Sequence, residues 1–367
     1  MNRTTLLLLA LLTILSNTIF AQDINQIIEK SAKNLLKDKE FNAVSIGIYK
    51  DGKQYIQHFG ELTPGGNNPP NDKTIYEIAS VTKTFTGYLV AKAVLEKKLY
   101  LDDNVAQYLE GNYSNLTFQG KAITLRHLLT HTSGLPHFMS PEMTEVFRKL
   151  EPETPDKFRW LEENMTKALF FEHLSAFVLK EAPGTKYSYS NAGAELVGYI
   201  LTTIYGKSID KLLQENFIDR LEMKNTAIRI SKDQEEHLAK GYWFKNANSS
   251  PSWLNPLWAS GAGIKSTMPD LMKYIQFNLT DEDPIMDESH EILYQKKTRW
   301  MSYFWNAWKD KHGTSYNHHG GTTGTQNWLM LFPKYDLGIS VITNHSDTKT
   351  PTQMRKEISK ILKAIIK

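Results

Sequence analysis

The spacing of apolar residues changes along the chain and predicts its elements. In residues 24–37 apolar side chains recur every three to four positions, which predicts an amphipathic helix. Residues 41–62 switch to alternation, and the dipeptide Asp51-Gly52 divides them into two runs. Because Asp-Gly favours the tight turn that joins antiparallel strands, we expect a β-hairpin here. Residues 82–99 return to helical spacing over about five turns.

The middle of the chain is mostly helical by the same criterion, and its end returns to strands. Helical spacing is found near residues 124–131, 155–180, 192–205, 208–216 and 268–278. Strand patterns follow in residues 301–309, 314–320, 325–333 and 337–344, before an amphipathic helix over residues 350–366. We therefore predict an α/β (α+β) fold in which both ends of the chain form one antiparallel sheet flanked by helices. Residues 22–75 and 300–367 would form this sheet lobe, and residues 76–299 a helical lobe.

Residues 1–21 have the layout of a secretory signal peptide. Arg3 is followed by an apolar run over residues 6–15, and small and polar residues precede Ala21. The run is shorter than the roughly 20 apolar residues of a membrane span, so a retained anchor helix is the less favoured alternative. Cleavage after Ala21 would leave residues 22–367, which are enough for one large domain with a substantial core.

Composition narrows the classes of protein that fit. The 367 residues contain no cysteine, which excludes disulfides and a lipid-bearing cysteine at the cleavage site. Lys and Arg number 43 against 40 Asp and Glu, and the basic residues are scattered without a run of five or more. A nucleic-acid surface is therefore not indicated. An exported chain of this length without cysteine fits a bacterial periplasmic or secreted enzyme.

Ser80 and Lys83 stand three positions apart where the predicted helix of residues 82–99 begins. Residues at this spacing share one face of a helix, so the amine can reach a hydroxyl that lies near the positive helix end. An amine accepts a proton only when it is neutral, which requires desolvation or neighbouring positive charge. The pair could be a nucleophile with its base, or a helix cap with a solvated lysine. The spacing alone does not decide between them.

Further motifs favour the catalytic interpretation. They are Tyr189-Ser190-Asn191 before a helix, His318-His319-Gly320 followed by Gly321, LRHLLTHTSGLP at 125–136 and WASGAGIKSTMPDLMKYI at 258–275. In this order and with these gaps, they and Ser80-x-x-Lys83 resemble the serine β-lactamase and penicillin-binding-protein superfamily. The chain looks most similar to the class C β-lactamase-related branch, with its esterases, D-amino-acid peptidases and carboxypeptidases. The resemblance covers about residues 25–360 and implies a β-lactamase/transpeptidase-like fold.

The resemblance also implies a role for each matching residue. Ser80 would be the acylated nucleophile, and Lys83 would hold or relay its proton. Tyr189 would activate Ser80 and protonate the leaving group, with its phenol made more acidic by Lys83. Asn191 would orient Lys83 and bind the substrate amide or ester, and it could also be the N-cap of the next helix. The backbone amides of Ser80 and Gly321 would form the oxyanion hole.

The chain departs from the β-lactamase pattern at one motif. Where those enzymes carry Lys-Thr-Gly, residues 318–320 read His-His-Gly. A histidine with an ordinary pKa of about 6.5 is mostly neutral at pH 7, so His318 and Gly320 would form a poor anchor for a substrate carboxylate. This variant resembles the esterase and D-aminopeptidase side of the family.

We therefore expect an exported serine hydrolase that forms an acyl-enzyme on Ser80 and cleaves an ester or a small amide, without a cofactor or metal. Its partner would be a small molecule or a short peptide, for which cell-wall fragments are one candidate, and not nucleic acid. No stable membrane span would remain after removal of the signal peptide. One alternative is a β-lactamase or D-Ala-D-Ala carboxypeptidase. An alternative of another class is a catalytically inactive protein that binds peptidoglycan fragments.

Other chemistry is less well supported by the sequence. His127 and His131 lie four apart, but no Glu follows His127 as in a zinc-protease helix, so we expect structural histidines. Before Lys265 the glycine of a phosphate-binding loop is replaced by Ile264. No serine lies in the Gly-x-Ser-x-Gly turn of the α/β-hydrolases. The aromatic segment of residues 243–258 looks exposed and could line a substrate cleft, which we favour, or pack between the lobes.

Overall fold

The computed structural model describes residues 23–38, 41–244, 248–280 and 282–366. The expected signal peptide, residues 1–21, lies outside these residues. Among the described residues, every helix falls short of the length and apolar character that a membrane crossing needs.

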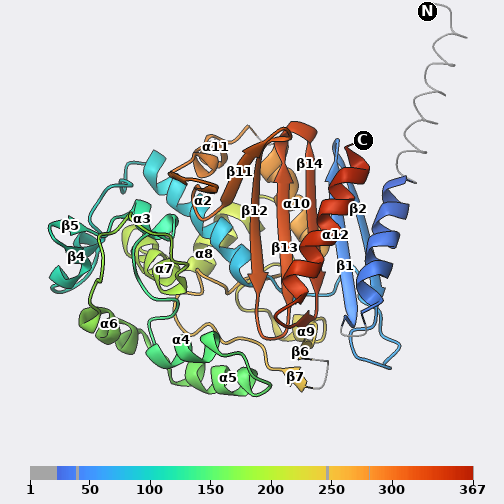
Figure 1. Ribbon diagram of the computed structural model, residues 1–367, viewed down its shortest axis with the longest axis horizontal. Coiled ribbons are helices and arrows are strands. Elements are labelled where there is room, and N and C mark those ends of the chain that lie inside the picture. The colour runs from blue at the N-terminus through green and yellow to red at the C-terminus, as the bar shows by residue number, and fades with distance from the viewer. Residues whose placement is uncertain (1–22, 39–40, 245–247, 281, 367) are drawn as a thin grey trace, which may run out of the picture.

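An eight-stranded antiparallel sheet forms the centre of the protein (Figure 1). Its order is β2-β1-β14-β13-β12-β11-β10-β9, so the two ends of the chain meet where β1 pairs with β14. The strands are β1 (Ala43–Lys50), β2 (Lys53–Gly60), β9 (Tyr294–Lys296), β10 (Arg299–Met301), β11 (Asn306–Asp310), β12 (Gly313–Gly321), β13 (Gln326–Phe332) and β14 (Leu337–Thr343). The predicted antiparallel sheet from both ends of the chain is therefore confirmed.

Short strands and helices make up the rest. The short strands are β3 (Tyr76–Glu77), which pairs with β8 (Lys265–Ser266), β4 (Thr117–Phe118) with β5 (Lys121–Ala122), and β6 (Gly241–Trp243) between β7 (Asn248–Ser250) and β15 (His345–Ser346). The helices are one over residues 23–36, α2 (Thr82–Leu95), α3 (Leu125–Leu129), α4 (Pro141–Arg148), α5 (Thr154–Asn164), α6 (Lys167–Ala176), α7 (Asn191–Tyr205), α8 (Ile209–Leu213), α9 (Lys232–Glu235), α10 (Met268–Thr280), α11 (Pro284–His290) and α12 (Thr350–Ile365). Single turns are the 3₁₀ turns η1 (Ala79–Val81), η2 (Val105–Tyr108), η3 (Ser114–Leu116) and η5 (Pro333–Tyr335), and the π-helical turn η4 (Gln214–Ile218).

The predicted hairpin at the start of the sheet is confirmed. β1 and β2 pair up to Lys50 opposite Lys53, which leaves a loop of Asp51 and Gly52. Both loop residues have positive φ, 48° and 77°, as the tight turn of a two-residue hairpin requires.

Two local predictions are wrong, each because of a turn that the apolar pattern hides. The single strand expected over residues 301–309 is broken between β10 and β11, where Phe304 has a φ of 66° and Ser302 N donates to Trp305 O across 3.1 Å. The helical pattern of residues 155–180 is broken between α5 and α6, because Thr166 Oγ1 accepts a hydrogen bond from Leu169 N and starts a new helix.

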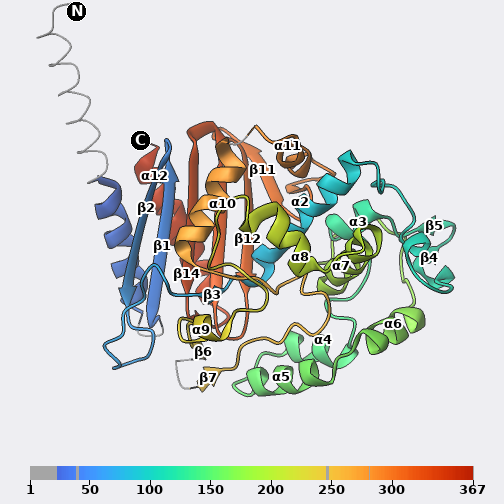
Figure 2. The ribbon, with the colours of Figure 1, turned by 180° about the vertical axis from the view of Figure 1, so that it is seen from behind.

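Helices cover both faces of the sheet (Figures 1 and 2). The helix of residues 23–36 and α12 lie on one face, where Ile28, Ile46, Ile339 and Ile358 are buried in one cluster. On the other face α10 packs against β1 and β14 (Figure 2). α10 falls within the residues that the sequence division assigns to the helical lobe, so a segment from the middle of the chain also covers the sheet.

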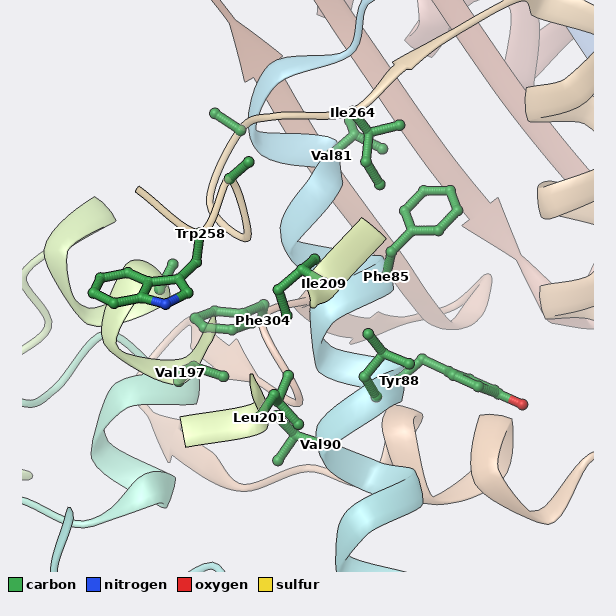
Figure 3. Close-up of a cluster of buried hydrophobic side chains, with 14 of the residues drawn as sticks. Val81, Phe85, Tyr88, Val90, Val197, Leu201, Ile209, Trp258, Ile264 and Phe304 are labelled. Atoms are coloured by element: carbon green, nitrogen blue, oxygen red, sulfur yellow. The ribbon is translucent and has the colours of Figure 1, made fainter. Parts of the chain in front are cut away.

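The larger core surrounds α2 (Figure 3). Phe85 of α2, Leu201 of α7, Ile209 of α8 and Phe304 are buried together in this cluster. α2 is buried on nearly all sides, as expected of a helix without a polar face. Its packing fixes the first turn of α2, which carries Lys83.

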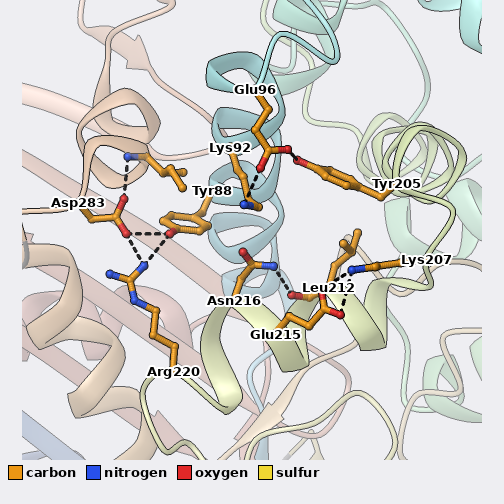
Figure 4. Close-up of polar contacts among 11 residues, drawn as sticks. Tyr88, Lys92, Glu96, Tyr205, Lys207, Leu212, Glu215, Asn216, Arg220 and Asp283 are labelled. Carbon is orange, nitrogen blue, oxygen red and sulfur yellow. Dashed lines mark hydrogen bonds and ion pairs between the residues drawn. The ribbon is translucent and has the colours of Figure 1, made fainter.

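Polar contacts tie α2 to its neighbours (Figure 4). Tyr88 OH donates to Asp283 Oδ2 across 2.9 Å, and Arg220 pairs with the same carboxylate. On another side of the helix, Tyr205 OH donates to Glu96 Oε2 across 2.9 Å. These contacts hold the N-terminal end of α11 and the end of α7 against α2.

Candidate active site

Ser80 lies in the turn η1, between β3 and α2. The preceding residue, Ala79, has a φ of 46°, a conformation that costs a non-glycine residue roughly 1 kcal/mol. β12 packs directly against this turn: a Cβ atom on Gly320 would lie 2.1 Å from Ile78 O and 3.2 Å from Ser80 N. Only glycine fits at this close approach, which brings the end of β12, with Gly321, beside Ser80.

Lys83 is buried beneath Ser80 and has three acceptors. Its Nζ lies 3.1 Å from Ser80 Oγ, 2.6 Å from Asn191 Oδ1 and 2.7 Å from Gly261 O. Burial lowers the pKa of Lys83 to about 7, and the charge of Glu195 opposes this shift. A neutral amine is therefore available near pH 7 to accept a proton from Ser80.

Tyr189 lies on the other side of Ser80, and its OH donates to Ser80 Oγ across 2.7 Å. The desolvated surroundings raise the pKa of Tyr189 above its ordinary value of 10. The expectation of a phenol more acidic than ordinary is therefore wrong for the free site, because desolvation, which raises the pKa, outweighs the hydrogen bond to Ser80, which lowers it. Tyr189 is a proton donor here, and its ring packs 4.3 Å from that of His131.

Asn191 is the first residue of α7 and not its cap. The N-cap is Ser190, whose Oγ accepts a hydrogen bond from Gly193 N across 2.8 Å. The alternative that Asn191 caps this helix is therefore wrong. Its side chain is directed to Lys83 instead.

His318 takes the place of the β-lactamase lysine and is buried. Its Nδ1 donates to the carbonyl oxygen of His319 across 2.8 Å. Burial, followed by the charge of Lys83, lowers the pKa of His318 to about 3, so the ring is neutral. The neighbouring His319 faces Gln326, with 2.6 Å between Nε2 and Oε1. His318 therefore brings no positive charge to the site.

A cleft of about 1110 Å³, its open part included, lies over Ser80. Its lining includes the aromatic residues Phe147, Trp243 and Trp253 and the polar residues Thr322, Thr323, Gln326 and Ser346. Among the described residues that line it, none is Lys or Arg, and Asp347 is the one carboxylate. The cleft is thus lined by aromatic side chains and by polar ones, with one carboxylate and no cation among the described residues.

The aromatic segment of residues 243–258 is only partly as predicted. Trp243 and Trp253 line the cleft, whereas Trp258 packs against Phe170. All three indoles are buried under neighbouring aromatic rings, whereas Leu254 is 42% exposed, so the expectation of an exposed segment holds only in part.

The structure therefore brings together all the side chains that the sequence placed in the site. It adds Glu195, which lies outside the motifs, and Gly261 and His131, which lie inside two of them without an assigned catalytic role. Glu195 follows Asn191 by four residues, and this one-turn spacing was a signal that the two share a face of α7. In the described part of the chain, no group of three or more His, Asp or Glu could hold a metal ion.

Comparison with known proteins identifies the family. The family model described as Beta-lactamase matches residues 28–363, so the chain belongs to the β-lactamase family. It is 29% identical over 281 residues to a protein of Providencia stuartii named β-lactamase, which covers 74% of this chain and 63% of the relative. It is 26% identical over 348 residues to Protein flp of Staphylococcus aureus (strain N315), which covers 91% of this chain and 66% of the relative. The chain thus spans less than two thirds of the length of either relative.

A solved structure confirms the predicted fold. The crystal structure of a β-lactamase/D-alanine carboxypeptidase from Yersinia pestis, complexed with citrate, matches with a TM-score of 0.80 and 22% sequence identity. The match covers 94% of this chain and 99% of that chain. The β-lactamase/transpeptidase-like fold and the family resemblance are confirmed, and family membership indicates a hydrolase.

Proposed function

We propose that the protein is an exported serine hydrolase that cleaves an ester or a small amide through an acyl-enzyme on Ser80. The observation that carries this proposal is that Ser80 Oγ has an amine and a phenol as its two polar neighbours, Lys83 Nζ at 3.1 Å and Tyr189 OH at 2.7 Å. One of these groups can be neutral and basic near pH 7, while the other remains protonated.

Acylation follows from these proton positions. Lys83 in its neutral form takes the proton of Ser80, and Oγ then bonds to the substrate carbonyl carbon. The carbonyl oxygen gains negative charge, which the amides of Ser80 and Gly321 would stabilise. The bond to the leaving group breaks as Tyr189 donates its proton to it, and Lys83 returns a proton to the phenolate. A water molecule then attacks the acyl carbon and gives a proton to the neutral Lys83. The ester bond to Ser80 breaks, Ser80 Oγ takes that proton, and the acid is released.

The described cleft residues include one carboxylate, Asp347, and no cation, which favours substrates without a carboxylate. His318 is uncharged, and no described residue that lines the cleft is Lys or Arg. An anionic substrate would lose hydration there without gaining a fixed cation, whereas an ester or neutral amide would not. Trp253 and Phe147 offer an apolar wall for such a group. Esters and small neutral amides, amides of D-amino acids included, are therefore the substrates that we favour.

Export is part of the proposal and is supported by residues 1–21, with their short apolar run after Arg3. A periplasmic or secreted location would give the enzyme access to small esters and to peptides of the cell wall. The absence of cysteine is compatible with either location, since no thiol is exposed to oxidation.

The time course of p-nitrophenol release from a short-chain acyl ester tests the proposal. We expect turnover by the wild type and a loss of at least about a thousandfold in Ser80→Ala. Ser175→Ala is the matched control, because Ser175 is exposed on α6, away from the cleft. Equal release by the wild type and Ser80→Ala would reject the ester hydrolase. If D-peptides and β-lactams also failed, the inactive peptidoglycan-binding alternative would be favoured.

A β-lactamase or D-Ala carboxypeptidase is the second candidate. It is supported by the names of the Providencia relative and of the Yersinia structure. Ser80-dependent hydrolysis of a carboxylate-bearing β-lactam at a rate above that of neutral esters would favour it.

A further inference from the structure

Glu195 lies close to the active site but is not among the residues that line the cleft over Ser80. It is partly buried on α7, one turn after Asn191, beside a mostly apolar cavity of about 550 Å³. Its Oε1 accepts a hydrogen bond from Gly261 N across 3.0 Å, and its Oε2 accepts one from Trp258 N across 2.9 Å. The carboxylate thus holds the backbone of the segment that passes behind Lys83.

Gly261 connects this carboxylate to the lysine. Its N–H donates to Glu195, and its carbonyl oxygen accepts from Lys83 Nζ across 2.7 Å. A Cβ atom on Gly261 would lie 3.0 Å from Glu195 Oε1 and 3.5 Å from Lys83 Nζ. A single glycine therefore separates the anion from the amine, and a side chain at this position would push them apart.

Among the charged groups, Glu195 also has the largest effect on the pKa of Lys83. The other titratable groups that face Lys83 from the surrounding elements are Tyr189, His131, His137 and His318. Their surroundings keep the phenol protonated and the three rings neutral, because desolvation raises the pKa of Tyr189 and lowers those of the histidines. Burial raises the pKa of Glu195, but both of its oxygens accept backbone N–H groups, which suits the ionised form.

We infer that Glu195 is the positioning residue of the catalytic lysine. It holds the Gly261 carbonyl oxygen against Lys83 Nζ, and its negative charge favours the protonated form of that amine. The inference rests on the proposed serine-hydrolase function. An amine that is too weak a base would not hold the Ser80 proton during acylation, so an anion nearby keeps Lys83 effective. Glu195 does this without occupying substrate space.

Glu162, on α5, provides a matched control because its carboxylate anchors the same loop. Its carboxylate accepts hydrogen bonds from Leu254 N at 3.0 Å and Asn255 N at 3.3 Å, so it also anchors this loop. Burial raises the pKa of Glu162 to about 7, although its backbone hydrogen bonds oppose the shift. Glu162 does not touch Gly261 or Lys83. Changes to Glu162 therefore report on loop anchoring without changing the charge beside Lys83.

The test compares the pH dependence of kcat/KM for Glu195→Gln, Glu162→Gln and the wild type on the same ester. In Glu195→Gln we expect the acidic limb to move to lower pH by about one pH unit, because the charge that favours protonated Lys83 is gone. We also expect kcat to fall about tenfold, because the amide cannot accept both N–H groups. In Glu162→Gln the limb should stay in place. An unmoved limb in Glu195→Gln, or a limb that moves only in Glu162→Gln, would overturn the inference.

A direct titration separates this inference from the proposed function. NMR of the 13Cε-labelled lysines, with the Lys83 signal identified by its absence in Lys83→Met, should show a lower pKa of Lys83 in Glu195→Gln than in the wild type. An unchanged titration would overturn the inference even if esters are hydrolysed. A shifted titration without any Ser80-dependent turnover would support the link to Lys83 and reject the hydrolase. If Glu195→Gln does not fold, Glu195→Asp keeps the charge, and its Lys83 should titrate as in the wild type; a lowered pKa there would overturn the inference.

Discussion

The phenol of Tyr189 donates a hydrogen bond to Ser80 Oγ across 2.7 Å, although 109 residues separate the two in the chain. Lys83, on α2, reaches the same oxygen with its Nζ. The nucleophile therefore has a proton acceptor and a proton donor at once, each on a different segment. This division of roles leads to separate predictions for the two groups.

Tyr189→Phe should slow acylation by about 100- to 10,000-fold for a substrate that needs a proton on its leaving group. An alkyl ester is such a substrate, whereas p-nitrophenolate leaves without protonation. The ratio of kcat/KM losses for the two esters measures this role, and we expect the larger loss with the alkyl ester. Tyr187→Phe is the control. It removes a phenol whose ring packs against the guanidinium of Arg299, 4.0 Å away, and not against Ser80. Equal losses with both esters would contradict a donor role.

The activity of the wild type should depend on a group that titrates near neutral pH. Burial lowers the pKa of Lys83 to about 7, and only its neutral form accepts the Ser80 proton. Below that pH the amine is protonated, so kcat/KM should fall about tenfold per pH unit, and above it the rate should level off. Rates between about pH 5 and about pH 9 check this. Lys83→Arg should be nearly inactive throughout, since a guanidinium stays protonated; activity close to the wild type would exclude the lysine as base.

His318→Lys should shift selectivity toward substrates that carry a carboxylate. The wild-type ring is neutral, so the substitution adds a cation where the substrate binds. The ratio of kcat/KM for a β-lactam over a neutral ester should rise about tenfold, the size of a modest charge pair. His318→Gln removes the ring without adding charge and serves as control. The interpretation fails if the two variants give the same ratio.

Gly320→Ala should lower kcat more strongly than it lowers the stability of the fold. The new Cβ would meet Ile78 O at 2.1 Å, so η1 and β12 must separate and the Ser80 and Gly321 amides with them. A loss of one oxyanion donor costs about a hundredfold to a thousandfold in kcat. Gly193→Ala makes the same chemical change in α7, where the Cβ would meet nothing closer than 3.4 Å. That control should keep full activity and gain up to about 1 kcal/mol in stability; equal kcat for the two variants would argue against the oxyanion hole.

Asp283→Ala should destabilise the fold without changing the chemistry. Asp283 accepts from Tyr88 OH at 2.9 Å and from Ile285 N at 2.7 Å, and it pairs with Arg220. Its removal takes an acceptor from Tyr88 OH and Ile285 N and the ion pair from Arg220, and should cost about 2–3 kcal/mol, because Arg220 is partly exposed and can turn to water. Thermal unfolding measures the cost. Asp210→Ala, which breaks a surface pair with Arg229, should cost under about 1 kcal/mol. Similar melting temperatures for both variants would contradict the network.

Features that depend on near neighbours in the chain could be predicted from the sequence. Alternation and Asp51-Gly52 specified the hairpin, because strand period and turn chemistry are local properties. The three-residue spacing of Ser80 and Lys83 put both on one helix face, and the motif order identified the family. The neutral character expected of His318 also followed from its residue type, and burial strengthens it.

The protonation states in the site, by contrast, depend on packing between distant segments. Lys83 is a usable base because distant segments bury it, and Glu195 acts on it through a glycine in a third segment. Tyr189 is a donor because its surroundings exclude water, which reversed the expectation drawn from its neighbour Lys83. Proton affinities depend on desolvation and on charges close in space. These quantities are set by packing between segments far apart in the chain, so no local pattern of residues could supply them.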